Sequence, residues 1–223
     1  MPFKPTETQA SIIQSGLEAL LVQAGPGSGK TYVITERIRH LLSQPDGHFH
    51  VLGLTFTNKA AGEMKRRLLE FPDLQERSYI GTIHGFCAEV LRERGAAIGL
   101  ESAPTILESS NDQKALLYRA IENTPDLRAE CERRFSRESL EKIVGNWLNR
   151  IGEAKRGILA KSLPVDPQGD PLFLRVFEVY GNLMRAMGLV DFDDLLLLTR
   201  QLFIERPKIA AFFRKLYRFI CFD

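Results

Sequence analysis

The chain has 223 residues, of which 44% are hydrophobic and 26% are charged, and this ordinary globular usage excludes the disordered and fibrous classes. Thirty Lys and Arg against 28 Asp and Glu leave a net charge of +2, so any contact with nucleic acid must come from a local patch. The three cysteines are far apart in the sequence, which excludes a zinc ribbon or a disulfide scaffold. With no long apolar run and no apolar signal segment at the N-terminus, we expect a cytoplasmic protein that does not enter the membrane.

The first hundred residues alternate short apolar runs with helical patterns, which is typical of a parallel sheet flanked by helices. Buried strands are predicted over 19–22, 51–56 and 78–83. Helices are predicted from 30 to about 44, from 58 to 70 and from 84 to 97, each close behind a strand or turn. Strand-to-helix changes within two or three residues are usual in α/β folds. This part therefore predicts an α/β domain.

Between 108 and 188 the pattern becomes entirely helical, with apolar residues from Leu140 to Ile151 at helical spacing and Ser136 as a predicted N-cap. We interpret this stretch as a helical subdomain inserted into the α/β domain. Two further helices are predicted over 191–203 and 207–217, followed by the apolar run 219–222 and Asp223. That ending has the pattern of a buried strand with an acid at its tip. Since a core strand normally leads into another element, we expect the chain to be the N-terminal piece of a longer protein.

A glycine-rich turn lies between the first predicted strand and the first long helix. Glycines let backbone N–H groups wrap closely around a phosphate, and a helix N-terminus adds unpaired N–H groups and a favourable dipole. Lys30 is expected to reach the β- and γ-phosphates of ATP, and the Thr31 hydroxyl is expected to coordinate Mg²⁺. A flexible turn that only caps a helix would not need Gly29, Lys30 and Thr31 in that order. The predicted cofactor-binding residues of the turn are Ala24, Gly25, Pro26, Gly27, Ser28, Gly29, Lys30 and Thr31.

A nucleotide site also needs an acid near the metal, usually at the carboxyl end of a neighbouring strand. Asp223 follows four apolar residues and has this position, so we assign it to Mg²⁺ beside Thr31 and to the catalytic set with Lys30. The alternative is a polar residue that merely ends a strand. The strict phosphate-loop pattern begins with Gly, and the compact Ala24 stands in its place.

With these residues, the chain resembles the superfamily 1 DNA helicases of the UvrD/Rep/PcrA type over essentially its whole length. Gln9 lies 15 residues before Ala24, where these helicases carry the glutamine that reads adenine, whose N7 acceptor and N6 donor one amide can satisfy. The resemblance implies a RecA-like ATP-binding domain, called 1A, over 1–107 and 189–223. It also implies a helical subdomain, called 1B, over 108–188. Tyr32 departs from the family, in which Arg is frequent at this position.

Two segments resemble the family's DNA-contacting motifs. The segment Thr55–Met64 is similar to motif Ia, and Gly81–Phe86 is similar to motif Ib, each where a predicted strand leads into a helix. From the pattern alone, motif Ia is an ordinary capped helix with Phe56 in the core, and the resemblance instead makes Phe56 a stacking platform for a base. The DNA-binding residues that it implies in these motifs are Phe56, Thr57, Asn58, Lys59, Thr82 and His84.

The acids from Asp191 to Asp194 are explained most simply as the cap of a helix, whose dipole they complement. A nuclease metal site is the alternative, but its partner residues are missing and the spacing is that of a cap. In relatives the aromatic residue of this segment touches single-stranded DNA, so the resemblance assigns Phe192 to DNA. His84 is not expected to bind a metal, because no His, Cys or acid lies at a metal-ligand spacing from it.

The implied function is that of an ATP-dependent helicase or translocase that moves 3′ to 5′ on single-stranded DNA and at single-strand/double-strand junctions, in a process such as DNA repair. The glutamate that follows the strand acid in these helicases and the second RecA-like domain with its arginines are absent from the sequence. We therefore expect this stretch alone to bind nucleotide and DNA weakly and not to unwind DNA.

Three alternatives remain open. The first is the helicase subunit of a recombination nuclease of the RecB/AddA kind, although those proteins usually have a much longer insertion. The second is a non-catalytic, nucleotide-dependent module that binds DNA or recruits partners. The third is a small-molecule kinase with a phosphate loop, in which motifs Ia and Ib would have no place.

Overall fold

The computed structural model describes residues 4–16, 19–44, 49–135, 140–160 and 169–223. They fall into two units, of which the first combines Met1–Phe86 with Lys208–Asp223 and the second is Cys87–Pro207. The first unit contains the larger sheet, and the second is mainly helical. Helix α5 (Ile83–Arg94) begins in the first unit and continues in the second.

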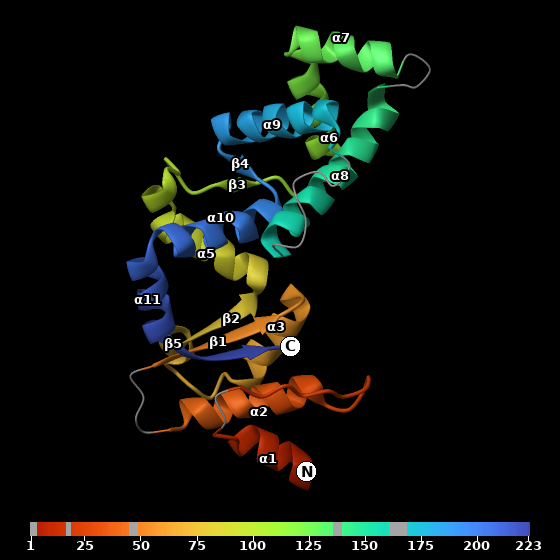
Figure 1. The fold of residues 1–223 in the computed structure, drawn as a ribbon. Helices are drawn as coiled ribbons and strands as arrows, with labels where there is room; N and C mark the ends of the chain where they lie inside the picture. Colours follow the sequence, from red (N-terminus) through yellow and green to blue (C-terminus); the bar gives the residue numbers. More distant parts are fainter. Residues whose placement is uncertain (1–3, 17–18, 45–48, 136–139, 161–168) are drawn as a thin grey trace. The chain divides into compact units, whose positions relative to one another are not determined.

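The sheet of the first unit has the strand order β2-β1-β5, and all its pairs are parallel. Central strand β1 (His50–Thr55) lies between β2 (Ser78–Thr82) and β5 (Tyr217–Phe222), as Figure 1 shows. The carboxyl ends of parallel strands meet at one edge of a sheet. This edge therefore carries the residues that follow each strand, and the Asp223 N–H donates to the Leu54 carbonyl at 2.9 Å.

Helices pack on this sheet through their apolar residues. Helix α2 (Lys30–Leu42) contacts β1 and β5, and α1 (Glu7–Gln14) packs against α2. The unit also contains α3 (Asn58–Arg67), α4 (Leu74–Arg77) and most of α11 (Pro207–Leu216). The buried core between helices and sheet consists of Ile38, Leu41, Leu42, Phe49, Val51, Met64, Leu68, Leu74, Ile80 and Cys221.

The second unit is held by a separate apolar core among its helices, which includes Trp147, Phe173 and Tyr180. Its helices are α6 (Ser110–Glu122), α7 (Pro125–Arg134), α8 (Leu140–Ala160), α9 (Pro171–Ala186) and α10 (Phe192–Glu205), and a 3₁₀ turn covers Gly95–Ile98. Two short strands, β3 (Thr105–Ile106) and β4 (Leu189–Val190), pair in parallel.

The structure confirms an α/β fold with a parallel sheet and helices within a few residues of their predicted bounds. The predicted helical face of α8 is buried or partly buried, whereas Ser136, its predicted N-cap, lies outside the described residues. Contact between α10 and both α8 and the 3₁₀ turn places α10 in the helical unit. The boundaries of the proposed domains at 107/108 and 188/189 stay a prediction. No helix among the described residues has the length and apolar character needed to cross a bilayer.

Two strand predictions need correction. The apolar run 19–22 forms no strand, and Leu21 is 84% exposed. An apolar run becomes a strand only when a neighbouring strand accepts its hydrogen bonds, and here the run lines a cavity together with residues of β5. The run 219–222 is a strand but not a buried one, because β5 is the outer strand of the described sheet, with Ile220 66% and Phe222 58% exposed.

Candidate functional site

The glycine-rich turn is shaped by two residues in the left-handed region. Gly27 has φ 75° and Gly29 has φ 85°, a conformation that strains residues with a Cβ. The Ser28 hydroxyl and N–H both donate to the Gly25 carbonyl, at 2.8 and 3.4 Å. Gly29 is the N-cap of α2, so the free N–H groups of that helix begin at the turn.

Lys30, the first residue of α2, lies folded against the turn. Its Nζ donates to the carbonyl oxygens of Ala24 at 2.9 Å and Gly25 at 2.8 Å. An ammonium group and the N–H groups at the start of a helix thus meet in one exposed loop, and such groups can bind an anion together.

Thr31 and Asp223 meet although 192 positions separate them in the chain. The Thr31 hydroxyl donates to Asp223 Oδ2 at 2.9 Å. Parallel pairing of β5 with β1 sets the position of Asp223 just past the end of β5. A hydroxyl and a carboxylate oxygen are the hard oxygen ligands that Mg²⁺ prefers, and Mg²⁺ usually keeps several waters besides. The donor set therefore fits Mg²⁺.

Gln9 of α1 reaches the glycine-rich turn. Its Oε1 accepts from the Thr6 N–H at 3.0 Å, within the capping box that begins α1, and its Nε2 donates to the Ser28 carbonyl at 3.2 Å. A Cβ at position 29 would lie 3.2 Å from Gln9 Nε2, which is a second reason for glycine there. The amide keeps one further N–H and one further lone pair, and these are the groups that an adenine edge needs.

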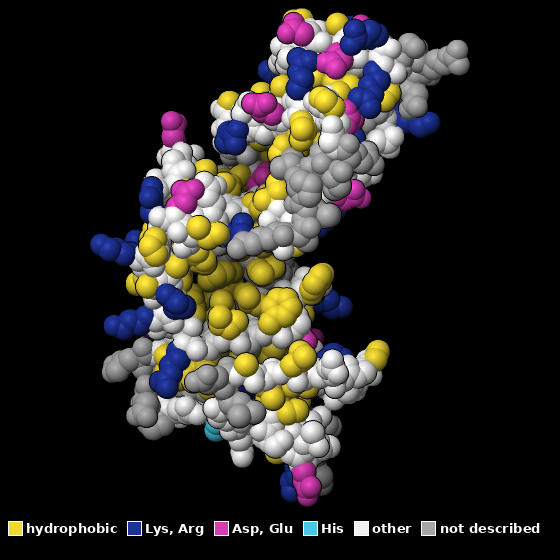
Figure 2. All heavy atoms as spheres, in the orientation of Figure 1, with side chains coloured by type: hydrophobic (Ala, Val, Ile, Leu, Met, Phe, Trp, Pro, Cys, Tyr) yellow, Lys and Arg dark blue, Asp and Glu magenta, His cyan; other side chains and the backbone are white. Residues whose placement is uncertain are grey.

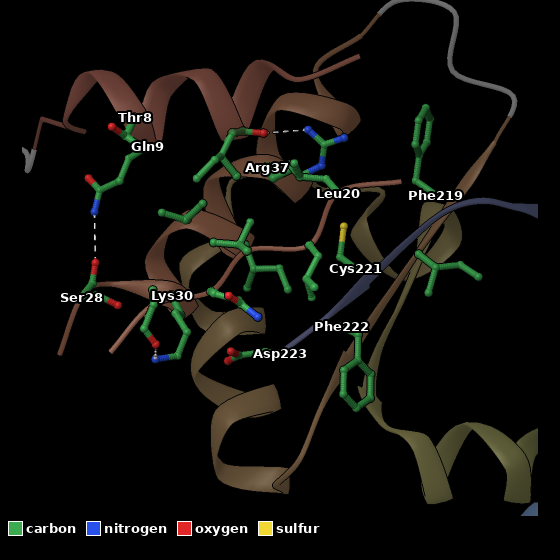
Figure 3. A pocket seen from close by; sticks show the side chains of 18 of the residues that line it. Thr8, Gln9, Leu20, Ser28, Lys30, Arg37, Phe219, Cys221, Phe222 and Asp223 are labelled. Atoms are coloured by element: carbon green, nitrogen blue, oxygen red, sulfur yellow. Dashed lines mark hydrogen bonds between the residues drawn. The ribbon is translucent and has the colours of Figure 1, made fainter. Parts of the chain in front are cut away.

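Gln9, Ala24, Ser28, Lys30 and Asp223 line a cavity of about 1010 Å³. Figure 3 shows Gln9, Ser28, Lys30 and Asp223 around it. It is also lined by Leu20, Leu21 and Val22, by Arg37 of α2, and by residues 218–222 of β5. The structure thus brings together residues from three distant parts of the sequence. Sequence reasoning missed Arg37, because an arginine two turns into a helix gives no signal of its own.

The motif Ia residues follow β1 at the carboxyl edge of the sheet. Phe56 is 87% exposed, so the interpretation that places it in the core is wrong. The Thr57 hydroxyl accepts from the Ala60 N–H at 3.1 Å and caps α3, so this helix is capped as the pattern predicts. Asn58 and Lys59 are exposed in the first turn of α3.

The motif Ib residues follow β2 at the same edge. Thr82 pairs with Thr55 of β1 in the parallel register, and neighbouring strands lie about 4.8 Å apart. The Thr82 hydroxyl accepts from the Gly85 N–H at 3.1 Å, and His84 is half-buried in the first turn of α5. The two predicted DNA segments are therefore adjacent.

Phe192 lies in the second unit, at the start of α10, and is 41% exposed. Asp191 caps this helix in a reciprocal box with Asp194. Buried Lys155 donates to Asp191 at 2.6 Å and lies 2.8 Å from Asp194. Burial raises the pKa of Asp194, and the Lys155 charge opposes that rise. The predicted cap is confirmed.

The nuclease alternative gains no support from these acids. Asp193 pairs with Arg156 at 3.1 Å, so each of the three carboxylates has a cationic partner. Across the part of the chain that the structure describes, no three His, Cys, Asp or Glu side chains are grouped to hold a metal ion.

The geometry agrees with the family to which the sequence is similar. The sequence profile of the UvrD/REP helicase N-terminal domain matches residues 5–223. The chain belongs to this family. It is 33% identical over 203 residues to a probable DNA helicase II homolog of Mycoplasma capricolum subsp. capricolum, and 31% identical over 217 residues to the ATP-dependent DNA helicase PcrA of Staphylococcus aureus.

The alignments cover most of this chain but little of the relatives. They include 90% and 96% of this chain, but only 27% of the Mycoplasma protein and 28% of the Staphylococcus protein. The PcrA helicase of Leuconostoc citreum is similar to the same degree, at 32% identity over 218 residues. The chain therefore spans just over a quarter of the length of these relatives.

Proposed function

We propose that this UvrD/REP helicase N-terminal domain binds ATP with Mg²⁺ and contributes that site to an ATP-dependent DNA helicase or translocase. The observation that carries the proposal is the convergence of Gln9, the Lys30 loop and Asp223 on one cavity. A turn that only caps a helix, or an acid that only ends a strand, would not need Gln9, Lys30 and Asp223 around the same cavity. The names of the relatives, DNA helicase II homolog and ATP-dependent DNA helicase PcrA, point to the same activity.

Each residue around the cavity has a separate task in the proposed site. Lys30 and the free N–H groups at the start of α2 would bind the β- and γ-phosphates, for which the ammonium must leave the carbonyls of Ala24 and Gly25. Thr31 and Asp223 would hold Mg²⁺, which supplies positive charge that lowers the cost of charge developing on the transferred phosphoryl group. The Gln9 amide would orient the adenine ring and thereby place the triphosphate over the loop.

Single-stranded DNA is the proposed partner of the sheet edge formed by motifs Ia and Ib. Phe56 would stack on a base, while Lys59 and the N–H groups at the start of α3 would contact phosphates. Phe192 is proposed as a contact from the helical part. Movement 3′ to 5′, a preference for single-strand/double-strand junctions and cytoplasmic location belong to the same proposal. The RecA-like 1A and helical 1B domains would follow the boundaries given above.

Replacing Lys30 with alanine tests the nucleotide site. The variant removes the only side-chain cation of the turn, so we expect Mg-ATP affinity measured by calorimetry to fall by about 100-fold and ATP turnover in the full-length protein to be lost. The fold should survive, because Lys30 bonds only to carbonyls of its own exposed loop among the described residues. Lys65→Ala, in the exposed last turn of α3, is the matched control and should bind ATP normally. Normal turnover in Lys30→Ala would defeat the proposal.

A further inference from the structure

Arg37 joins the end of α1 to α2. Its Nη1 lies within hydrogen-bond distance of three carbonyl oxygens, those of Ile12 at 2.9 Å, Ile13 at 3.2 Å and Ser15 at 3.0 Å. Figure 3 shows this side chain directed toward α1 from α2. All three acceptors belong to the last turn of α1 or to its C-cap.

These bonds matter because α1 has little else to hold it. It has eight residues, and Ile13 is its buried residue, whereas isolated helices shorter than about 12 residues are marginal in water. The last carbonyls of any helix lack partners within the helix, and a cation there also offsets the negative end of the dipole. A guanidinium supplies both the donors and the charge, so Arg37 is the polar anchor of this helix end.

The other end of α1 is attached through Gln9. The Thr6 N–H fixes the amide oxygen of Gln9, which leaves Nε2 to donate to the Ser28 carbonyl. Helix α1 is therefore tied at both ends to one continuous segment, at Ser28 in the phosphate loop and at Arg37 in the helix that the loop begins. The distance between the glycine-rich turn and the Gln9 amide therefore depends on two contacts, the bond from Gln9 to Ser28 and the bonds from Arg37 to α1.

We propose that Arg37 is a positioning residue for adenine selection, which acts by holding α1 so that the Gln9 amide faces the base. The inference rests on the function proposed above. Although Arg37 also lines the cavity, it need not touch the nucleotide to act, because its Nη1 is already engaged by the carbonyls at the end of α1. Without Arg37, helix α1 and its Gln9 amide would move more freely relative to the base, while the glycine-rich turn would keep all its own residues.

The test compares Arg37→Met, Arg37→Lys and Gln9→Ala with the unchanged chain by calorimetry. The probes are Mg-ATP, Mg-ITP and tripolyphosphate, since ITP has an oxygen in place of the N6 amine and tripolyphosphate has no base. We expect Arg37→Met to lower ATP affinity about tenfold, as Gln9→Ala does, and to leave ITP and tripolyphosphate within about twofold. Arg37→Lys keeps the charge and should restore part of the preference for ATP.

A control and a second measurement separate the possible outcomes. Arg39→Met removes another arginine of α2, one that pairs with Glu70 and donates to the Arg67 carbonyl, and it should keep the ATP preference. Hydrogen exchange of the chain without nucleotide should show faster exchange of α1 amides in Arg37→Met, but not in Arg39→Met. Unchanged exchange, or an equal loss of affinity for all three probes, would overturn the positioning role. Failure of the unchanged chain to bind ATP would instead overturn the proposed function, and adenine selection with it.

Discussion

The two units of the chain differ in where their charged and apolar groups find partners. In the helical unit, charged side chains pair with one another across helices, as Lys155 of α8 does with Asp191 and Asp194 at the start of α10. In the sheet-bearing unit, the distinctive polar groups surround a cavity, and large apolar side chains such as Phe56 stay exposed. On the face shown in Figure 2, charges of both signs are interspersed over the helical unit.

This difference separates stability from binding. Interactions that begin and end within the helical unit stabilise its fold, so their loss should appear as a lower free energy of unfolding. Groups at the edge of the sheet make few bonds that the fold needs, so their loss should appear in ligand affinity. Variants of each kind can therefore test the comparison directly.

The largest expected effect on stability comes from Lys155→Met. The change leaves Asp191 and Asp194 without their buried cation, and the loss of one partner from a buried ion pair costs about 3–5 kcal/mol. Urea unfolding followed by tryptophan fluorescence measures this effect in the helical unit, because Trp147, the single tryptophan, is buried in its core. Stability of the variant should recover as the pH falls, since the raised pKa of buried Asp194 lets it become neutral.

The neighbouring residue provides the control. Arg156 is on the same helix and pairs with Asp193, but its side chain is 59% exposed, and exposed ion pairs contribute at most about 1 kcal/mol. If Arg156→Met and Lys155→Met lowered the free energy of unfolding equally, burial of the Lys155 ion pairs would have no effect on stability. That result would contradict the difference between the two units.

Phe56→Ala tests the opposite behaviour in the sheet-bearing unit. If the ring stacks on a base, affinity for oligo(dT), measured by fluorescence anisotropy, should fall by about 1–3 kcal/mol. The free energy of unfolding should hardly change, because the ring is 87% exposed and belongs to no core. Lost stability with unchanged DNA affinity would restore a structural role for Phe56.

Leu69→Ala is the matched control for Phe56. Leu69 is 73% exposed and follows the opposite end of α3, some 15 Å away along a ten-residue helix. The Leu69→Ala variant should bind oligo(dT) with the same affinity as the unchanged chain. Weaker binding in both variants would indicate a general apolar effect rather than a stacking site.

Local patterns predicted helices α2, α3, α5, α10 and α11 and all three strands of the main sheet, because their apolar spacing and capping residues act within a few positions. The helix predicted after Phe56 is capped, by Thr57, and Asp191 caps the helix that its segment was predicted to begin. The run 19–22 has the same apolar composition as a strand, but pairing depends on a neighbour that no local pattern reveals. Burial of β5 was misjudged for the same reason, since position in the sheet decides it.

The site was predictable where function restricts residue type and spacing. The glycines of the turn, followed by Lys30 and Thr31, predict a phosphate loop before a helix, and the offset of Gln9 has meaning only beside them. The contact between Thr31 and Asp223 followed from the rule that ligands bind at strand ends. Arg37 could not be predicted, because its importance depends on the three carbonyls it reaches in the folded chain.

The smallest expected effect comes from Asp170→Asn, at the start of α9. Although burial opposes it, hydrogen bonds from Arg134 and Arg150 lower the pKa of Asp170 below its ordinary 3.8. A carboxyl whose folded-state pKa is lowered stabilises the fold above its unfolded-state pKa, and that stabilisation disappears as the pH falls through the folded-state value. Asparagine can still accept from the Leu172 N–H and cap α9, so the variant keeps the cap but removes the charge and the second oxygen, which accepts from Arg150. Near pH 7 it should be less stable by about 1 kcal/mol, and the difference should shrink as the pH falls through the lowered folded-state pKa of Asp170, in urea titrations followed by Trp147 fluorescence. Arg134 belongs to α7 and Arg150 to α8. A stability difference that stays constant at every pH would mean that packing, rather than paired charge, holds α7, α8 and α9 together.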